Sequence, residues 1–248
     1  MYPEKRCKKW LAEHEKLLQL ANNQTDLLLL GDSILFNLNR YPDTLGDTNL
    51  INFGLRGDRI QNLMYRIQYG LLPISRNVLI LIGTNNIGKN NPQEIADGII
   101  SVSSMVKARL PQSKILIHGL LPRDASSSKY RKTVALVNHI LKTITDTNYF
   151  IYIEPDLQQW TPNGCLNPNF YFKDGLHLIK GGYVYLNKVI KPLMKHTSPV
   201  NTLPTVPLSA VLKLSFGVSP KKQKVYKKHK RATTFTLKFI DNRDFDLL

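Results

Sequence analysis

The sequence predicts an α/β fold in which a doubly wound, five-stranded parallel sheet lies between two layers of helices. Three observations predict it. Five short apolar runs are continuous instead of alternating, as is typical of strands buried on both faces. Segments with helical spacing separate these runs along the chain. The 248 residues, 42% of them hydrophobic, are enough for one such domain with a two-sided core.

The five runs give the expected strands, and each is bordered by polar residues or by glycine. They cover residues 26–30, 49–53, 77–82, 114–117 and 149–153. Helices are expected over residues 8–20, 60–67, 93–110, 130–144 and 181–194, where apolar residues recur every three or four positions. We expect Asp58 to cap the helix that begins at residue 60.

The chain divides into a body and a basic extension. The body is predicted to cover residues 1–196, and the proline-containing segment 197–209 is predicted to be a linker. Residues 210–248 form the extension, which contains two β-prone segments. The extension is therefore expected to be either a short hairpin or partly disordered.

The formal net charge of +16 indicates an acidic partner, although it says nothing about the fold. Within residues 221–231 there is no acidic residue, and the basic ones are Lys221, Lys222, Lys224, Lys227, Lys228, Lys230 and Arg231. This run is either a solvated tail or a site for nucleic acid or anionic lipid. It also resembles a nuclear localisation signal.

Several classes of protein are excluded by composition. No apolar run approaches the ~20 residues of a membrane span, and the first residues lead into no apolar segment of a secretory signal. Cys7 and Cys165 are too few for a disulfide framework, and no Cys/His cluster has zinc spacing. We therefore expect a cytoplasmic protein that uses no metal and no cofactor.

Small and polar residues follow four of the predicted strands. Because parallel strands end at one edge of the sheet, these residues are expected to gather there. Ser33, within Gly-Asp-Ser, is the candidate nucleophile, and it needs a base to remove its proton. His177 is the only histidine in these motifs, and Asp174 lies three residues before it, so the two are the candidate base and its orienting carboxylate.

An acyl-transfer site also needs donors for an oxyanion. The backbone N–H groups of Ser33 and Gly57 and the side-chain amide of Asn85 are the candidates. Each motif by itself is also compatible with an ordinary turn. Four of them in order after predicted strands favour a catalytic site.

These blocks carry a family resemblance. Gly31-Asp-Ser33, Gly57, Gly-Thr-Asn85 and Asp174-Gly-Leu-His177 resemble the four blocks of the SGNH (GDSL-like) hydrolases. Asn52-Phe-Gly54, Gly83–Asn86, Gly119–Arg123 and the pair Trp10 and His14 further resemble the catalytic subunits of type Ib platelet-activating-factor acetylhydrolase.

The resemblance implies a three-layer, flavodoxin-like fold and a metal-free serine esterase. It implies Ser33, Asp174 and His177 as the triad, and hydrolysis of short acyl esters, with the sn-2 acetyl group of a phospholipid as the type substrate. It also implies a homodimer and a WD-repeat regulatory subunit as candidate partners.

Leu120 and Leu121 follow a predicted strand and are candidate walls of the acyl pocket.

The sequence departs from those subunits in two places. Arg56 stands where they have glycine, directly before Gly57, and is a candidate contact for an anionic head group. The basic extension is foreign to the subfamily, and an esterase body with such a tail also resembles the first-open-reading-frame protein of some retrotransposons. The alternative function is therefore nucleic-acid binding through the tail.

Overall fold

The computed structural model describes residues 8–46, 48–70, 72–144 and 150–194. The predicted linker and basic extension lie outside these residues. The five described strands form one sheet in the order β2-β1-β3-β4-β5, and every neighbouring pair is parallel. They are β1 (Gln24–Gly31), β2 (Leu50–Gly54), β3 (Ile74–Leu81), β4 (Lys114–His118) and β5 (Phe150–Ile153). This order is that of flavodoxin, so the predicted fold class is confirmed.

The five predicted helices are all present, with bounds that differ from the expected ones by a few residues. The α-helices are α1 (Lys8–Leu18), α2 (Ser33–Asn37), α3 (Ile60–Tyr69), α4 (Pro92–Arg109), α5 (Lys129–Ile144), α6 (Leu157–Trp160) and α7 (Lys180–Met194). The two short ones, α2 and α6, were not expected from the sequence. Their four or five residues are too few for helical periodicity to show.

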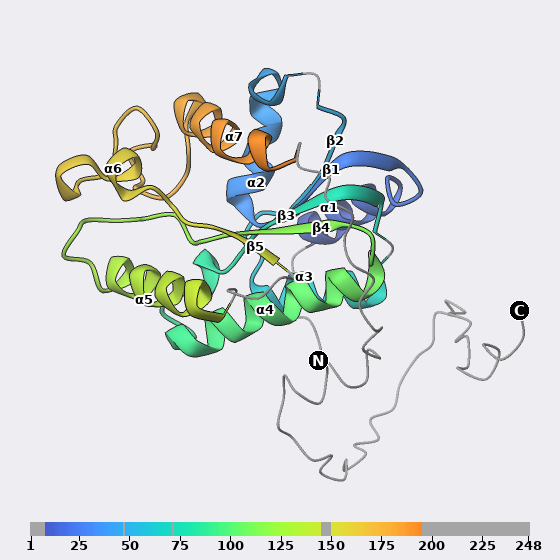
Figure 1. Cartoon of the computed structure of the whole chain (residues 1–248), viewed down its shortest axis with the longest axis horizontal. Coiled ribbons are helices and arrows are strands. Elements are labelled where there is room, and N and C mark those ends of the chain that lie inside the picture. The colour runs from blue at the N-terminus through green and yellow to red at the C-terminus, as the bar shows by residue number, and fades with distance from the viewer. Residues whose placement is uncertain (1–7, 47, 71, 145–149, 195–248) are drawn as a thin grey trace, which may run out of the picture. The chain divides into compact units, whose positions relative to one another are not determined.

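Successive strand residues face opposite helical layers. In β1, Leu28 and Leu30 pack in one core with side chains of α3, α4 and α5. Leu27 and Leu29 pack in the other core with side chains of α2 and α7. Figure 1 shows α3, α4 and α5 on one side of the sheet and α2 and α7 on the other. Because both faces are covered, the strands are apolar throughout and do not alternate.

Local sequence determines where α4 begins. Asn91 accepts a hydrogen bond from the backbone N–H of Glu94 (2.9 Å), and the Glu94 carboxylate accepts one from the backbone N–H of Asn91 (3.1 Å). Pro92 takes the first helical position, where it has no N–H to leave unsatisfied. The capping box therefore fixes the start of α4, which follows the loop that carries Asn85 along the chain.

The register of the sheet brings the strand ends to one level. Gly31, the last residue of β1, pairs with Gly54 at the end of β2 and with Leu81 at the end of β3. A Cβ at position 31 would collide with the carbonyl oxygen of Leu81, so only glycine fits there. The loops that follow these three strands therefore begin side by side.

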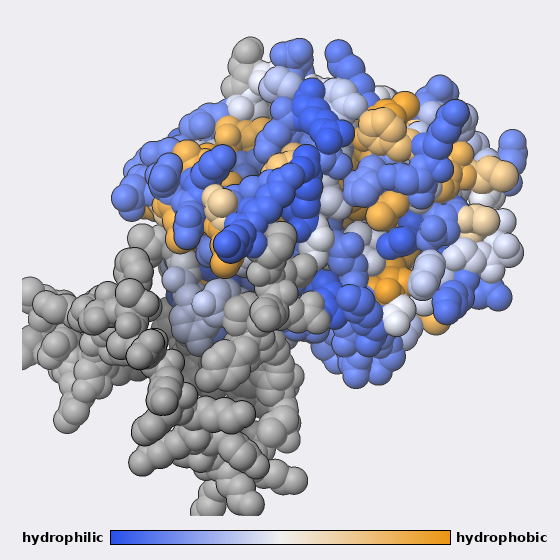
Figure 2. Space-filling model, turned by 180° about the vertical axis from the view of Figure 1, so that it is seen from behind, coloured by the Kyte–Doolittle hydropathy of each residue, from blue (hydrophilic) through white to orange (hydrophobic). Residues whose placement is uncertain are grey.

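The face shown in Figure 2 is largely hydrophilic, with apolar residues in small groups between polar ones. Among the helices that the structure describes, none is long and apolar enough to cross a membrane.

Candidate active site

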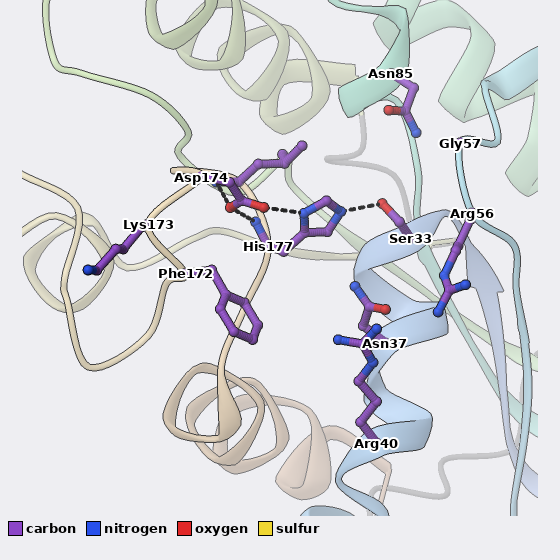
Figure 3. Close-up of a pocket in the computed structure, with 11 residues that line it drawn as sticks. Ser33, Asn37, Arg40, Arg56, Gly57, Asn85, Phe172, Lys173, Asp174 and His177 are labelled. Carbon is purple, nitrogen blue, oxygen red and sulfur yellow. Dashed lines mark hydrogen bonds and ion pairs between the residues drawn. The ribbon is translucent and has the colours of Figure 1, made fainter.

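Three side chains stand in a row at the edge where the strands end. The Ser33 Oγ lies 3.0 Å from Nε2 of His177, and Nδ1 of the same ring lies 2.6 Å from Oδ2 of Asp174. Figure 3 shows the three side chains pointing toward one another, with Ser33 on α2 and the other two on a loop that is distant in sequence. The structure thus brings together the three residues predicted as a triad.

The turn from β1 into α2 positions Ser33. Asp32 caps α2 by accepting a hydrogen bond from the backbone N–H of Ile34 (2.9 Å). Ser33 is the first residue of the helix and is 7% exposed. Its backbone N–H therefore belongs to the first turn, where N–H groups have no partner within the helix. Such a group is suited to donate to an oxyanion.

A short hairpin-like loop holds Asp174 and His177. The backbone N–H of Phe172 donates to the carbonyl of His177 (2.8 Å), and that of Gly175 donates to the carbonyl of Phe172 (3.1 Å). Gly175 has a φ of 65°, in the left-handed region that favours glycine. These bonds turn the chain sharply, so that the carboxylate and the ring three residues later meet.

Hydrogen bonds keep Asp174 ionised. Burial raises the pKa of this carboxyl, but bonds from the His177 ring and from the backbone N–H groups of His177 and Leu176 outweigh burial and hold the pKa below its usual value. Both backbone bonds measure 3.0 Å to Oδ1. An ionised carboxylate beside Nδ1 fixes the tautomer in which Nε2 accepts the proton of Ser33.

Two of the three candidate oxyanion donors lie on neighbouring loops. Gly57 follows β2 and has a φ of 70°, a conformation that a side chain would strain. Asn85 lies in the loop after β3, and its Nδ2 donates to the backbone carbonyl of Asp58 (2.9 Å). Among the described residues, no acceptor is seen for the second hydrogen of this amide, which can therefore donate to a substrate. Both residues line the same cleft as Ser33 and His177.

Asp58 does not have the predicted role of a helix cap. The N-cap position of α3 is Arg59, and the Asp58 carboxylate is completely buried. Its oxygens lie 2.6 Å from Nε1 of Trp10 and 2.7 Å from Nη2 of Arg66. The prediction was wrong because a buried arginine and an indole N–H, distant in sequence, compete successfully for this carboxylate.

A cleft of about 840 Å³ opens over the triad. Its lining includes Asn37, Arg40, Phe172, Lys173 and Leu176, none of which the sequence analysis singled out. Ser33, Asn37 and Arg40 have helical spacing, so a helix predicted at Ser33 would have placed them on one face. Phe172 and Lys173 directly precede Asp174, and this position in the sequence could have identified them as residues of the cleft.

The residues predicted to contact substrate separate into two groups. Arg56 lines the cleft, and its guanidinium carbon lies 4.2 Å from the centroid of the Phe36 ring, a cation–π contact. Leu120 and Leu121 are 1% and 3% exposed and belong to the two cores. Each leucine faces a helical layer and neither lines the described cleft, so the structure does not support the role predicted for them in the acyl pocket.

Two further residues that could carry chemistry, His118 and Cys165, lie outside the cleft lining. His118 is buried, its Nδ1 lies 2.6 Å from the carbonyl oxygen of Gly119, and burial lowers its pKa to about 4. These surroundings give His118 a structural role. Cys165 is exposed. Within the described part of the chain, no group of three or more His, Cys, Asp or Glu residues is placed to hold a metal ion.

The family model of the GDSL-like Lipase/Acylhydrolase proteins matches residues 29–184, which include Ser33, Asp174 and His177. The chain belongs to this family. It is therefore a hydrolase that acts on esters, as its resemblance to the SGNH hydrolases predicted.

Relatives in sequence support this assignment, and two solved structures share the fold. Platelet-activating factor acetylhydrolase IB subunit alpha2 of Homo sapiens and that of Bos taurus are each 30% identical over 192 residues, covering 75% of this chain and 82% of theirs. A GDSL-like lipase from Bacteroides thetaiotaomicron has 21% identity and a TM-score of 0.59, covering 76% of this chain and 96% of that one. An acetyl-xylooligosaccharide esterase from Geobacillus has a TM-score of 0.54 at 16% identity, covering 71% and 96%.

The family assignment leaves the predictions for the extension open. The seven basic residues of 221–231 lie outside the described residues, as does the proposed linker. Binding of nucleic acid or anionic lipid, nuclear localisation and the cytoplasmic location stay predictions. The same holds for a homodimer and a WD-repeat partner, although the two acetylhydrolase relatives are named as subunits.

Proposed function

We propose that the chain is a serine esterase for short acyl esters, with Ser33 as nucleophile, His177 as general base and acid, and Asp174 as the group that orients the histidine. The observation that carries this proposal is the continuous row from Ser33 through His177 to Asp174, with its distances of 3.0 and 2.6 Å. These are hydrogen-bond distances, as an activated nucleophile requires.

The proposed reaction has two halves. Ser33 Oγ attacks the ester carbonyl carbon while Nε2 of His177 takes its proton, which gives a tetrahedral intermediate. Three donors stabilise its oxyanion: the N–H groups of Ser33 and Gly57 and the amide of Asn85. When the carbon–alkoxy bond breaks, His177 returns the proton to the leaving alcohol. Water, deprotonated by His177, then attacks the acyl-enzyme. The acyl–Oγ bond breaks, His177 returns the proton to Ser33 Oγ, and the acid leaves.

We propose an acetyl ester as the substrate, with the sn-2 acetyl group of a phospholipid as one member of the class. Support comes from the relatives, which are named acetylhydrolases. The cleft is lined by three cationic residues, Arg40, Arg56 and Lys173. Asp174 is the one carboxylate among its lining residues, and it accepts three hydrogen bonds. A cleft with this charge favours substrates that carry a negative group near the ester.

The experiment is hydrolysis of p-nitrophenyl esters from acetyl to octanoyl by the full chain, its Ser33→Ala variant and a Ser126→Ala control. Ser126 lies on an exposed loop. We expect Ser33→Ala to lose on the order of a thousandfold or more in kcat, and Ser126→Ala to behave as wild type. Wild-type turnover by Ser33→Ala would refute the mechanism. A preference for octanoyl over acetyl would refute the proposed substrate class only.

A further inference from the structure

The loop between β4 and α5 contacts both loops of the proposed active site. The backbone N–H of Asp124 donates to the carbonyl of Gly175 (2.9 Å), within the loop that carries Asp174 and His177. The bonds of that loop described above, from Phe172 to His177 and from Gly175 to Phe172, are internal to it. The bond from Asp124 therefore ties the loop of the proposed base to another element of the fold.

The preceding residue reaches the loop that carries Asn85. Nη1 of Arg123 donates to the backbone carbonyl of Thr84 (3.2 Å) and to its Oγ1 (3.1 Å). Thr84, which directly precedes Asn85, is only 3% exposed. Because the first of these bonds holds the main chain beside Asn85, Arg123 limits the position of a proposed oxyanion donor.

An ion pair joins these two contacts. Nε of Arg123 donates to Oδ2 of Asp124 (2.8 Å), so one guanidinium binds Asp124 and Thr84 at the same time. The planar fork of the guanidinium presents its N–H groups in fixed directions, which allows this double contact. The side chains of Arg123 and Asp124 are 17% and 29% exposed, and this partial burial reduces the screening of the pair by salt and water.

Two further features hold the pair in place. Arg131 of α5 donates from Nε to the carbonyl of Arg123 (2.8 Å) and from Nη2 to the carbonyl of Asp124. Asp124 has a φ of 57°, in the left-handed region that residues other than glycine adopt at a cost. Such a conformation persists only where the surrounding structure maintains it. Here the bonds from Arg131 and the bond to Gly175 maintain it, so the connection is preorganised.

We propose that Arg123 is a positioning residue for the esterase reaction, and that Arg123 and Asp124 form a brace between the base and the oxyanion site. The proposal rests on the function proposed above. In that reaction His177 and Asn85 act on one ester group, the first at the leaving oxygen and the second at the carbonyl oxygen. They come from loops that are distant in sequence, and the brace fixes their separation. A displacement of about 1 Å can lower the rate about 10²-fold.

The first test is hydrolysis of p-nitrophenyl acetate by the full chain with Arg123→Ala. We expect kcat to fall about 10–100-fold and KM to stay within about threefold of wild type, because the brace orients groups that act in the transition state. Arg109→Ala is the matched control. Arg109 also donates to two backbone carbonyls, those of Gly70 and Gln68 (both 2.7 Å), but at the far end of α4. An Arg123→Ala enzyme whose kcat equals that of Arg109→Ala would overturn the proposal.

Arg123→Lys separates geometry from charge, and it replaces the alanine variant if that variant does not fold. Lysine keeps a positive charge beside Asp124, but its single ammonium lacks the fork that reaches both Asp124 and Thr84. We expect Arg123→Lys to remain folded, as measured by urea unfolding, and to lose at least about fivefold in kcat. Wild-type kcat in this variant would show that charge alone is sufficient and would refute the brace.

A double-mutant cycle tests whether the brace acts through the oxyanion site. In an Asn85→Ala background, Arg123→Ala is expected to lower kcat by at most about threefold more, because the donor that it positions is already gone. A residue that only supports the fold would cost the same factor with or without Asn85. Equal losses in the two backgrounds would therefore overturn the proposal.

Hydrogen exchange, followed by mass spectrometry, tests the brace without any ester. In Arg123→Ala, peptides that cover residues 84–90 and 170–179 are both expected to exchange faster than in wild type, and both are expected to be unchanged in Arg109→Ala. This result supports the brace even if no ester is hydrolysed, whereas unchanged exchange in either peptide of Arg123→Ala would refute it. Loss of activity in Ser33→Ala together with wild-type kcat in Arg123→Ala would refute the brace and leave the esterase proposal intact.

Discussion

The side chain of Asn85 donates a hydrogen bond of 2.9 Å to the backbone carbonyl of Asp58, the residue directly after Gly57. This bond ties together the loops that carry two of the three proposed oxyanion donors, Gly57 and Asn85. The Asp58 carboxylate is in turn held by Trp10 of α1 and Arg66 of α3. The loops of Gly57 and Asn85 are therefore held in place before any substrate binds. Such preorganisation is the condition for electrostatic stabilisation of a transition state.

Replacement of Asn85 by alanine removes one proposed oxyanion donor. We expect kcat for p-nitrophenyl acetate to fall about 10²–10³-fold with a smaller change in KM, because the lost interaction forms mainly in the transition state. Asn22→Ala is the control, since Asn22 is exposed before β1, far from the strand ends. An Asn85→Ala enzyme with wild-type kcat would exclude this amide from the oxyanion site.

Replacement of Asp58 by asparagine leaves the Arg66 charge buried and unpaired. We expect the free energy of unfolding, measured with urea, to fall by about 3–5 kcal/mol. Asp26→Asn is the matched control, because Asp26 forms an exposed, 3.7 Å pair with Arg76 that contributes at most about 1 kcal/mol. Equal losses from the two substitutions would show that the buried network contributes no more than a surface pair.

Replacement of Asp174 by asparagine removes the negative charge that orients the proposed base. We expect kcat to fall about 10³–10⁴-fold, because an amide favours the wrong tautomer of His177. Asp43→Asn, an exposed position, controls for the loss of one acidic group. The thermal midpoint of each variant shows whether folding is retained. If Asp174→Asn keeps wild-type kcat, the carboxylate has no part in catalysis.

The arrangement of strands and the row of Ser33, His177 and Asp174 could be predicted from the sequence. Parallel strands with two covered faces have continuous apolar runs, and their ends meet at one edge, so local patterns determine which motifs come together. Asp174 and His177 are also near in sequence. For such residues, spacing alone limits the geometry.

Side-chain direction and long-range pairing could not be predicted. Leu120 and Leu121 follow β4 at the active edge, yet both side chains enter the cores. Asp58 precedes a helix and has the residue type of a cap, yet its partners are Trp10 and Arg66. The two choices depend on which distant groups are buried nearby, and no pattern within a window of the sequence records this.

Asp32, the residue before the proposed nucleophile, is 1% exposed, and its environment predicts a distinctive pH dependence of stability. Burial raises its pKa to about 7, the Ile34 N–H opposes this, and Asp58 adds to it. The folded protein therefore keeps the proton between about pH 4 and pH 7, where the unfolded chain has lost it. Stability from this group is full below about pH 4 and falls as the pH rises to about 7.

Asparagine at position 32 stays neutral and still caps α2, so it isolates this titration. We expect the unfolding free energy of wild type relative to Asp32→Asn to fall by on the order of 4 kcal/mol between about pH 4 and pH 7, and then to stay level. Burial lowers the pKa values of His14 and His118 to about 4, and their contributions rise with pH in this window, but they are common to both proteins and cancel. Urea unfolding of both proteins across this range measures the difference. A difference that does not change with pH would show that Asp32 is ionised in the folded state.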